Sequence, residues 1–161
     1  VKDCNVSRIF GSTSVAIFAA NVVFNNLGSH AIEGNTVSGL YGASSPVGVP
    51  LVELPGSDGA ILVKYSVAGI VIRGANILVR DNTVVGNRFD SDTGGAPAIG
   101  ITQVQHAQIT GNRAVGPQSF ATIHDSEFIY LGDNTTSFDL EPTAGVNGFI
   151  ERGANTTGAG F

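Results

Sequence analysis

Hydrophobic positions along the chain recur at fixed distances from an asparagine. In each copy an aliphatic residue precedes the asparagine by three positions, a second small or aliphatic residue follows it by two, and a glycine follows by four. The pattern occupies residues 32–39, 79–86, 109–116 and 131–138, although the last copy lacks its final two positions. Self-similarity of this kind predicts a repeat architecture in which each unit stacks on the next.

A second hydrophobic element lies upstream of the asparagines and alternates with period two, as a strand with one buried face must. It occurs at residues 15–17, 70–72, 99–101, 121–123 and 148–150. Two copies lead into the same tetrapeptide, Arg-Gly-Ala-Asn, at residues 73–76 and 152–155. Helical spacing is not sustained anywhere, so we predict an all-β chain built from short strands.

The repeated asparagines Asn35, Asn82, Asn112 and Asn134 are separated by 47, 30 and 22 residues. We interpret 22 residues as one bare turn of the repeat, 30 as a turn with an insertion, and 47 as two turns. Asparagine suits a bend between strands because it tolerates left-handed backbone conformations. Its amide can also bond to the asparagine of the next turn, which would form a ladder. Cys4 fits the same register, and we expect it to be a buried substitute in that ladder.

The shared spacing also predicts how the core is built, because equivalent residues of stacked repeats point the same way. A unit of about twenty residues cannot bury its own apolar face and must stack on a copy of itself. The strands that end at Ile72, Ile101 and Ile123 should therefore lie parallel and adjacent. One inward aliphatic stack should contain Val79, Ile109 and Leu131.

Two stretches interrupt the period, residues 41–59 with three prolines and residues 87–97 with two glycines. Insertions in stacked repeats leave the repeat at one corner and often build a binding face. The candidate ligand-contacting residues in these stretches are Tyr41, Phe89, Asp90 and Asp92. Plain connecting loops would have a similar composition, so both interpretations stay open.

Composition narrows the possible functions. The net charge is −5 and the few Lys and Arg residues are scattered, which argues against a nucleic-acid partner. No run of 18 apolar residues occurs, so no membrane span is predicted. Cys4 is the single cysteine and excludes an internal disulfide, while three His residues and one Cys make no zinc pattern. We therefore predict no metal site.

The copies of Ile-x-Gly-Asn-x-Val-x-Gly, alternating with Gly-Ile-x-Ile strands, resemble the pectin-lyase-like superfamily of right-handed parallel β-helices. This superfamily includes polysaccharide lyases, epimerases, some glycoside hydrolases and phage tailspikes, and the likeness covers about residues 15–150. The resemblance implies one β-helix domain over residues 1–161, with about six to seven coils. The chain starts inside a coil-like segment without a cap, so it resembles the C-terminal portion of a longer β-helix. A polysaccharide partner, an extracellular or virion-surface location and a homotrimer are implied in the same way.

Candidate catalytic residues depend on the reaction. A glycoside hydrolase needs two carboxylates beside the scissile bond. Asp125 and Glu127 flank Ser126, and on one strand their side chains would share a face about 7 Å apart, within the range for an inverting enzyme. His124 stands next to this pair and completes the densest ionisable cluster of the chain.

A polysaccharide lyase needs instead a base and a cation that neutralises the sugar carboxylate. Arg73 and Arg80 are expected in one coil on neighbouring outward faces, where they could bind a carboxylate in bidentate fashion. No cofactor is expected, apart from Ca²⁺ if the chain is a lyase.

Three function classes stay open on the sequence. The first is a tailspike-type module that recognises a polysaccharide, with or without depolymerising it. The second is a fragment of a polysaccharide lyase or uronate epimerase. The third is a non-catalytic stalk or adhesin segment, in which the charged residues serve solubility alone.

Overall fold

The computed structural model describes residues 1–8, 10–11, 14–20, 30–42, 67–86, 88–89, 97–116, 119–137, 143–144 and 148–158. The described residues form strands, bends and turns, and none of them is helical. Every pair of neighbouring strands among them is parallel. The predicted all-β architecture is therefore confirmed for this part of the chain.

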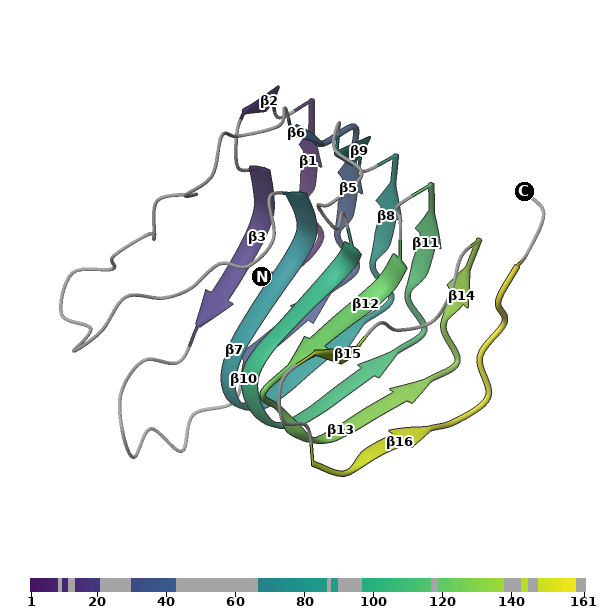
Figure 1. Ribbon diagram of the computed structural model, residues 1–161. Coiled ribbons are helices and arrows are strands. Elements are labelled where there is room, and N and C mark those ends of the chain that lie inside the picture. Colours follow the sequence, from purple (N-terminus) through teal and green to yellow (C-terminus); the bar gives the residue numbers. More distant parts are fainter. Residues whose placement is uncertain are drawn as a thin grey trace, which may run out of the picture.

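The largest sheet has eight strands and folds into two arms, because its long strands β7 (Val67–Arg80) and β10 (Pro97–Thr110) bend midway (Figure 1). The first arm stacks β3 (Ser14–Ala20), β7, β10, β12 (Ser119–His124) and β15 (Thr143–Ala144). The second arm stacks β4 (His30–Glu33), β7, β10, β13 (Glu127–Gly132) and β16 (Ile150–Arg152).

Two smaller sheets follow the second arm along the chain. A five-stranded sheet runs in the order β1 (Asn5–Ser7), β5 (Thr36–Ser38), β8 (Thr83–Val85), β11 (Arg113–Val115) and β14 (Thr135–Thr136). A three-stranded sheet contains β2 (Phe10–Gly11), β6 (Tyr41–Gly42) and β9 (Arg88–Phe89). Each passage of the chain through these sheets stacks on the previous one (Figure 1), and we call one such passage a layer.

A ladder of asparagines joins the layers where the second arm turns into the five-stranded sheet. The Asn82 Oδ1 accepts hydrogen bonds from the backbone N–H and the Nδ2 of Asn35, at 3.0 and 2.9 Å. The same pair of bonds links Asn82 to Asn112, Asn112 to Asn134, and Asn134 to Asn155. The first four of these side chains are almost fully buried. The predicted ladder is confirmed and extends one position further than expected.

Two expectations about this ladder are wrong. The 47 residues between Asn35 and Asn82 were interpreted as two turns, but these residues bond directly and belong to adjacent layers. Cys4 takes its predicted place, because its backbone N–H donates to the Asn35 Oδ1 at 2.9 Å. It is nevertheless exposed, because it stands at the N-terminal end of the described ladder and no described layer covers it.

A residue with positive φ precedes each of the first five ladder positions. These residues alternate between aspartate and glycine: Asp3, Gly34, Asp81, Gly111 and Asp133. The alternation has a steric cause at Gly111, where an added Cβ would lie 2.5 Å from the Asp81 Oδ1 of the layer before. Aspartate and glycine are two of the residue types that adopt this conformation readily.

The core is a set of inward columns with one residue per layer. Ile101 is in register with Ile72 and with Ile123, and all three are buried. Another column contains Ile32, Val79, Ile109 and Leu131, also buried. Both predicted stacks are confirmed.

The register of two upstream elements differs from the expectation. Ile17 aligns with Ile70 and not with Ile72, so the first element is displaced by two residues. Ile150 aligns with Ile129 of β13, which places the last element on the second arm. The identical tetrapeptides also differ in role, because Asn155 belongs to the ladder and Asn76 is an exposed residue at the bend of β7.

We predict that truncation of Ile109 to alanine lowers the free energy of unfolding by about 2 to 5 kcal/mol, because the layers on either side cannot collapse into the cavity. Chemical denaturation of the variant and the parent measures this change. Gln108→Ala is the matched control, since its exposed neighbouring side chain should change stability by no more than about 0.5 kcal/mol. A loss below about 1 kcal/mol for Ile109→Ala would contradict the inward column.

Replacement of Asn112 by alanine should cost at least about 3 kcal/mol, because several buried polar groups lose their partner and each costs about 1 to 3 kcal/mol. These groups include the N–H of Asn82 and the carbonyl of Val79. Asn155→Ala provides the comparison, since that side chain is only partly buried and water can replace its bonds. Equal losses for the two variants, measured by denaturation, would show that burial of the ladder is not what stabilises it.

Candidate functional site

The two arginines proposed as carboxylate ligands belong to one layer but not to one site. Arg73 lies in the bend of β7 and forms no ion pair with a described residue. Arg80 ends the same strand, seven residues or roughly 20 Å of extended chain further on. Its Nε is 2.8 Å from the Glu33 Oε1 on β4. The predicted common layer is confirmed, and the second arm of β7 separates the two positions along the chain.

The proposed acid pair is also arranged differently from the prediction. Strand β12 ends at His124 and β13 begins at Glu127, and Asp125 lies between them with a φ of 48°. The buried Ser126 holds this bend, since its Oγ donates to the His124 carbonyl and accepts from the Val104 N–H. Asp125 and Glu127 therefore do not alternate along one strand, and the separation of about 7 Å derived from that assumption has no basis.

Both carboxylates interact with neighbours in the chain. The Asp125 Oδ2 lies 2.7 Å from the His124 Nδ1. The Glu127 Oε1 accepts a hydrogen bond from the Gln105 Nε2 at 3.0 Å. The sequence thus identified a real cluster of ionisable side chains, and its members are tied to one another and to the adjacent layer.

The remaining candidates belong to the loops. Tyr41 and Phe89 lie on β6 and β9, which are adjacent strands of the three-stranded sheet, but their side chains are outside the described part. Asp90 and Asp92 lie outside the described residues. Within the described ranges, no group of three or more His, Cys, Asp or Glu side chains is placed to hold a metal ion. The same ranges contain no helix long and apolar enough to cross a membrane.

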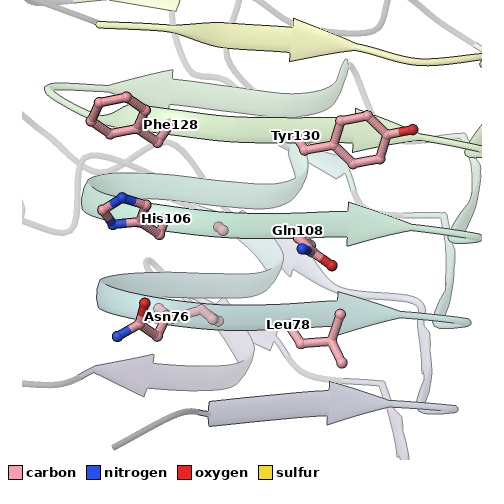
Figure 2. Close-up of a pocket in the computed structure, with 8 residues that line it drawn as sticks. Asn76, Leu78, His106, Gln108, Phe128 and Tyr130 are labelled. Atoms are coloured by element: carbon pink, nitrogen blue, oxygen red, sulfur yellow. The ribbon is translucent and has the colours of Figure 1, made fainter. Parts of the chain in front are cut away.

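A groove with a volume of about 380 Å³ lies on the outer face of the second arm. Three neighbouring strands form it, and each contributes two outward side chains on either side of one inward residue (Figure 2). We call the first set the bend column and the second set the strand column. The bend column contains Asn76, His106 and Phe128. The strand column contains Leu78, Gln108 and Tyr130.

Residues of the bend column share an unusual backbone conformation, with φ values of 55°, 61° and 54° for Asn76, His106 and Phe128. Equal backbone geometry in successive layers makes the side chains project in parallel. The rings of His106 and Phe128 accordingly stack with centroids 4.9 Å apart and planes inclined by 5°. This centroid distance is close to the spacing of adjacent strands in a sheet.

Phe128 is the exceptional member of the column. A left-handed conformation costs roughly 1–2 kcal/mol for an ordinary residue, and bulky side chains rarely adopt it. Burial does not compensate this cost, because 49% of the Phe128 surface is exposed. Strained residues of this kind concentrate at ligand-binding and catalytic sites, which makes Phe128 the strongest indication of function in the described structure.

Two glycines orient the aromatic ring of the strand column. An added Cβ at Gly132 would lie 2.5 Å from the Tyr130 Oη, and one at Gly153 would contact the same oxygen. The phenol ring therefore lies along the surface over both glycines, one on its own strand and one after β16. Only glycine leaves room for this orientation, so the position of the Tyr130 ring depends on both glycines.

Several polar groups of the groove are available to a ligand. The side-chain amides of Asn76 and Gln108 and the hydroxyl of Tyr130 make no hydrogen bond with another residue in the described part of the chain. Gln105, by contrast, donates to Glu127. The groove combines aromatic surface with free donors and acceptors, which is the usual composition of a small-molecule or oligomer site.

Comparisons with protein-family models, curated proteins and solved structures gave no match to this chain. The function is therefore inferred from the groove. The site was not predicted from the sequence, because its residues carry no formal charge and the candidates there were mainly ionisable residues. A usable signal was present, since the strand column immediately precedes the aliphatic residue of the last three asparagine repeats. The bend column stands two positions earlier.

We predict that Phe128→Asn changes the free energy of unfolding by less than about 1 kcal/mol. Asparagine relieves the left-handed strain, which is worth roughly 1–2 kcal/mol, and this gain offsets the loss of the ring stack, worth about 0.5–1.5 kcal/mol. Phe120→Ala is the contrasting variant, because that buried ring on β12 should cost about 3–5 kcal/mol. Thermal denaturation of both variants measures the difference. A cost of 3 kcal/mol or more for Phe128→Asn, on the order of a core truncation, would mean that Phe128 is a structural residue.

Proposed function

We propose that the chain is a right-handed parallel β-helix that binds a polysaccharide in the groove on its second arm. Two features support the helical path: every strand pairing in the described part is parallel, and the chain visits the arms and the small sheets in the same order in successive layers. The right hand follows from the general preference of crossovers between parallel strands, which are right-handed in about 98% of cases.

The main support for binding is Phe128, which is exposed and has a strained backbone. It lies beside Tyr130, whose ring lies over two glycines. A sugar ring has an apolar C–H face and a rim of hydroxyl groups. Aromatic side chains can pack against the C–H face and provide large contact areas. The free amides of Asn76 and Gln108 can form hydrogen bonds with the hydroxyl groups. A single sugar would fill little of the groove, whereas a chain of sugars can follow columns that repeat from layer to layer.

The geometry favours binding over cleavage. Asp125 and Glu127 are engaged with His124 and Gln105 and do not share a strand face. Arg80 is already paired with Glu33 and lies seven residues along the chain from Arg73, which weakens the specific argument for a lyase. A plain stalk would have no reason to retain a strained aromatic residue at an exposed position.

Tyr130→Ala and Phe128→Ala should each weaken binding of a recognised oligosaccharide at least about tenfold, because truncation of a central aromatic contact typically costs 1.4 kcal/mol or more. Isothermal titration calorimetry with a panel of capsular, plant and algal oligosaccharides measures this effect. Thr36→Ala, an exposed change on the five-stranded sheet, is the control and should bind as the parent does.

The double variant Asp125→Asn with Glu127→Gln separates binding from catalysis. It should bind the same oligosaccharide with unchanged affinity, and neither it nor the parent should release new reducing ends. Shortening of the glycan by the parent but not by this variant would contradict a purely binding role. Full binding by both aromatic variants would exclude the groove.

A further inference from the structure

The lining of the groove contains no carboxylate, ammonium or guanidinium group. None of its eight lining residues is Asp, Glu, Lys or Arg. The arginine closest in sequence, Arg80, is already paired with Glu33. A carboxylated or sulfated sugar would therefore find no cation in the groove to replace its hydration.

Acidic residues border the groove and add to this discrimination. Glu127 immediately precedes Phe128 on β13, and the exposed Glu151 is in register with Tyr130 on the next strand. The whole chain carries a net charge of −5. An anionic polymer would meet like charges at this edge and would be repelled.

The bend column also continues past the groove. Ile129 is in register with Ile150, so Phe149 follows Phe128 in the next layer. Phe149 is 62% exposed, the largest exposure among the exposed bulky hydrophobic residues of the described part. Asn76, His106, Phe128 and Phe149 thus occupy equivalent register positions in four layers, perpendicular to the strands, although Phe149 does not share the positive φ of the other three.

We propose that the ligand is an uncharged glycan that lies along this column, across the layers, with its sugar faces against Phe128 and Phe149 and its hydroxyls at the amides of the groove. This inference rests on the proposed glycan-binding function and specifies its ligand. The layer spacing of about 4.8 Å is close to the length of one sugar unit, so successive sugars meet successive layers.

The test compares neutral and acidic oligosaccharides of equal length by calorimetry, with cellohexaose, xylohexaose and mannohexaose against hexagalacturonate and hexamannuronate. At least one neutral hexasaccharide should bind, and the uronates should bind at least about tenfold more weakly or not at all. The neutral affinity should change by less than about twofold between low and high ionic strength, because no ion pairs are formed.

Two variants sharpen this test. Phe149→Ala lies outside the groove and should weaken the hexasaccharide at least about threefold while leaving the affinity of the matching disaccharide unchanged. Gln108→Arg places a cation in the middle of the strand column and should raise uronate affinity at least about tenfold. Equal effects of Phe149→Ala on both lengths would overturn the orientation along the column.

The possible failures are distinguishable. Tighter, salt-sensitive binding of a uronate at the groove would overturn the uncharged ligand and leave the proposed function intact. Absence of binding to every glycan, or binding that ignores Phe128 and Tyr130, would overturn both. Self-association in sedimentation experiments that Phe128→Ala abolishes would identify the groove as an interface between copies of this chain and would likewise overturn both.

Discussion

Hydrogen bonding between parallel layers is the constraint on which the remaining structure depends. The asparagine ladder shows the reason most clearly, because its asparagines are buried at the turn and their polar groups need partners. Asn82 supplies them in both directions: its Oδ1 accepts from Asn35 in one adjacent layer, and its backbone N–H and Nδ2 donate to the Asn112 Oδ1 in the other. A buried polar network of this kind is stable only when every member is satisfied. The ladder therefore holds each layer at a fixed position against the next.

The hydrogen bonds fix the position of one layer against the next. They do not fix the number of residues that connect two layers. Ladder neighbours are separated by 47, 30, 22 and 21 residues, yet their hydrogen bonds have nearly the same lengths. The entropy of closing a loop rises only slowly with its length, so long insertions disturb the stack little. Sequence spacing is consequently a poor guide to the number of layers, which is why 47 residues were interpreted as two turns.

The sequence predicted the parts of the fold that repeat. The ladder and the inward columns through Ile101 and Ile109 could be derived from the spacing of Asn and aliphatic residues alone. The bends of the long strands could not, because a residue such as Gln103 adopts positive φ without any local preference for it. Register at these bends is set by the neighbouring layer, so identical segments such as residues 73–76 and 152–155 take different roles.

The candidate site was harder to predict for a related reason. Ionisable residues attract attention in a chain with few charges, but stacking brings them next to complementary neighbours, as with Glu127 and Gln105. The groove consists instead of uncharged side chains whose significance appears only when three strands are aligned.

The fold also explains how a strained aromatic residue can persist at the surface. A left-handed Phe128 would destabilise an isolated hairpin, but here the flanking Ile129 is fixed in the core and the Phe149 carbonyl accepts its N–H. The layers on both sides thus determine the backbone conformation at this position. The side chain does not set this conformation and can serve contacts with a ligand. Outward residues of a stacked sheet can therefore be substituted without loss of the core. Each substitution alters one member of a column whose positions repeat at the same spacing. Such a repeated, exchangeable surface is what the proposed recognition of an extended ligand would require.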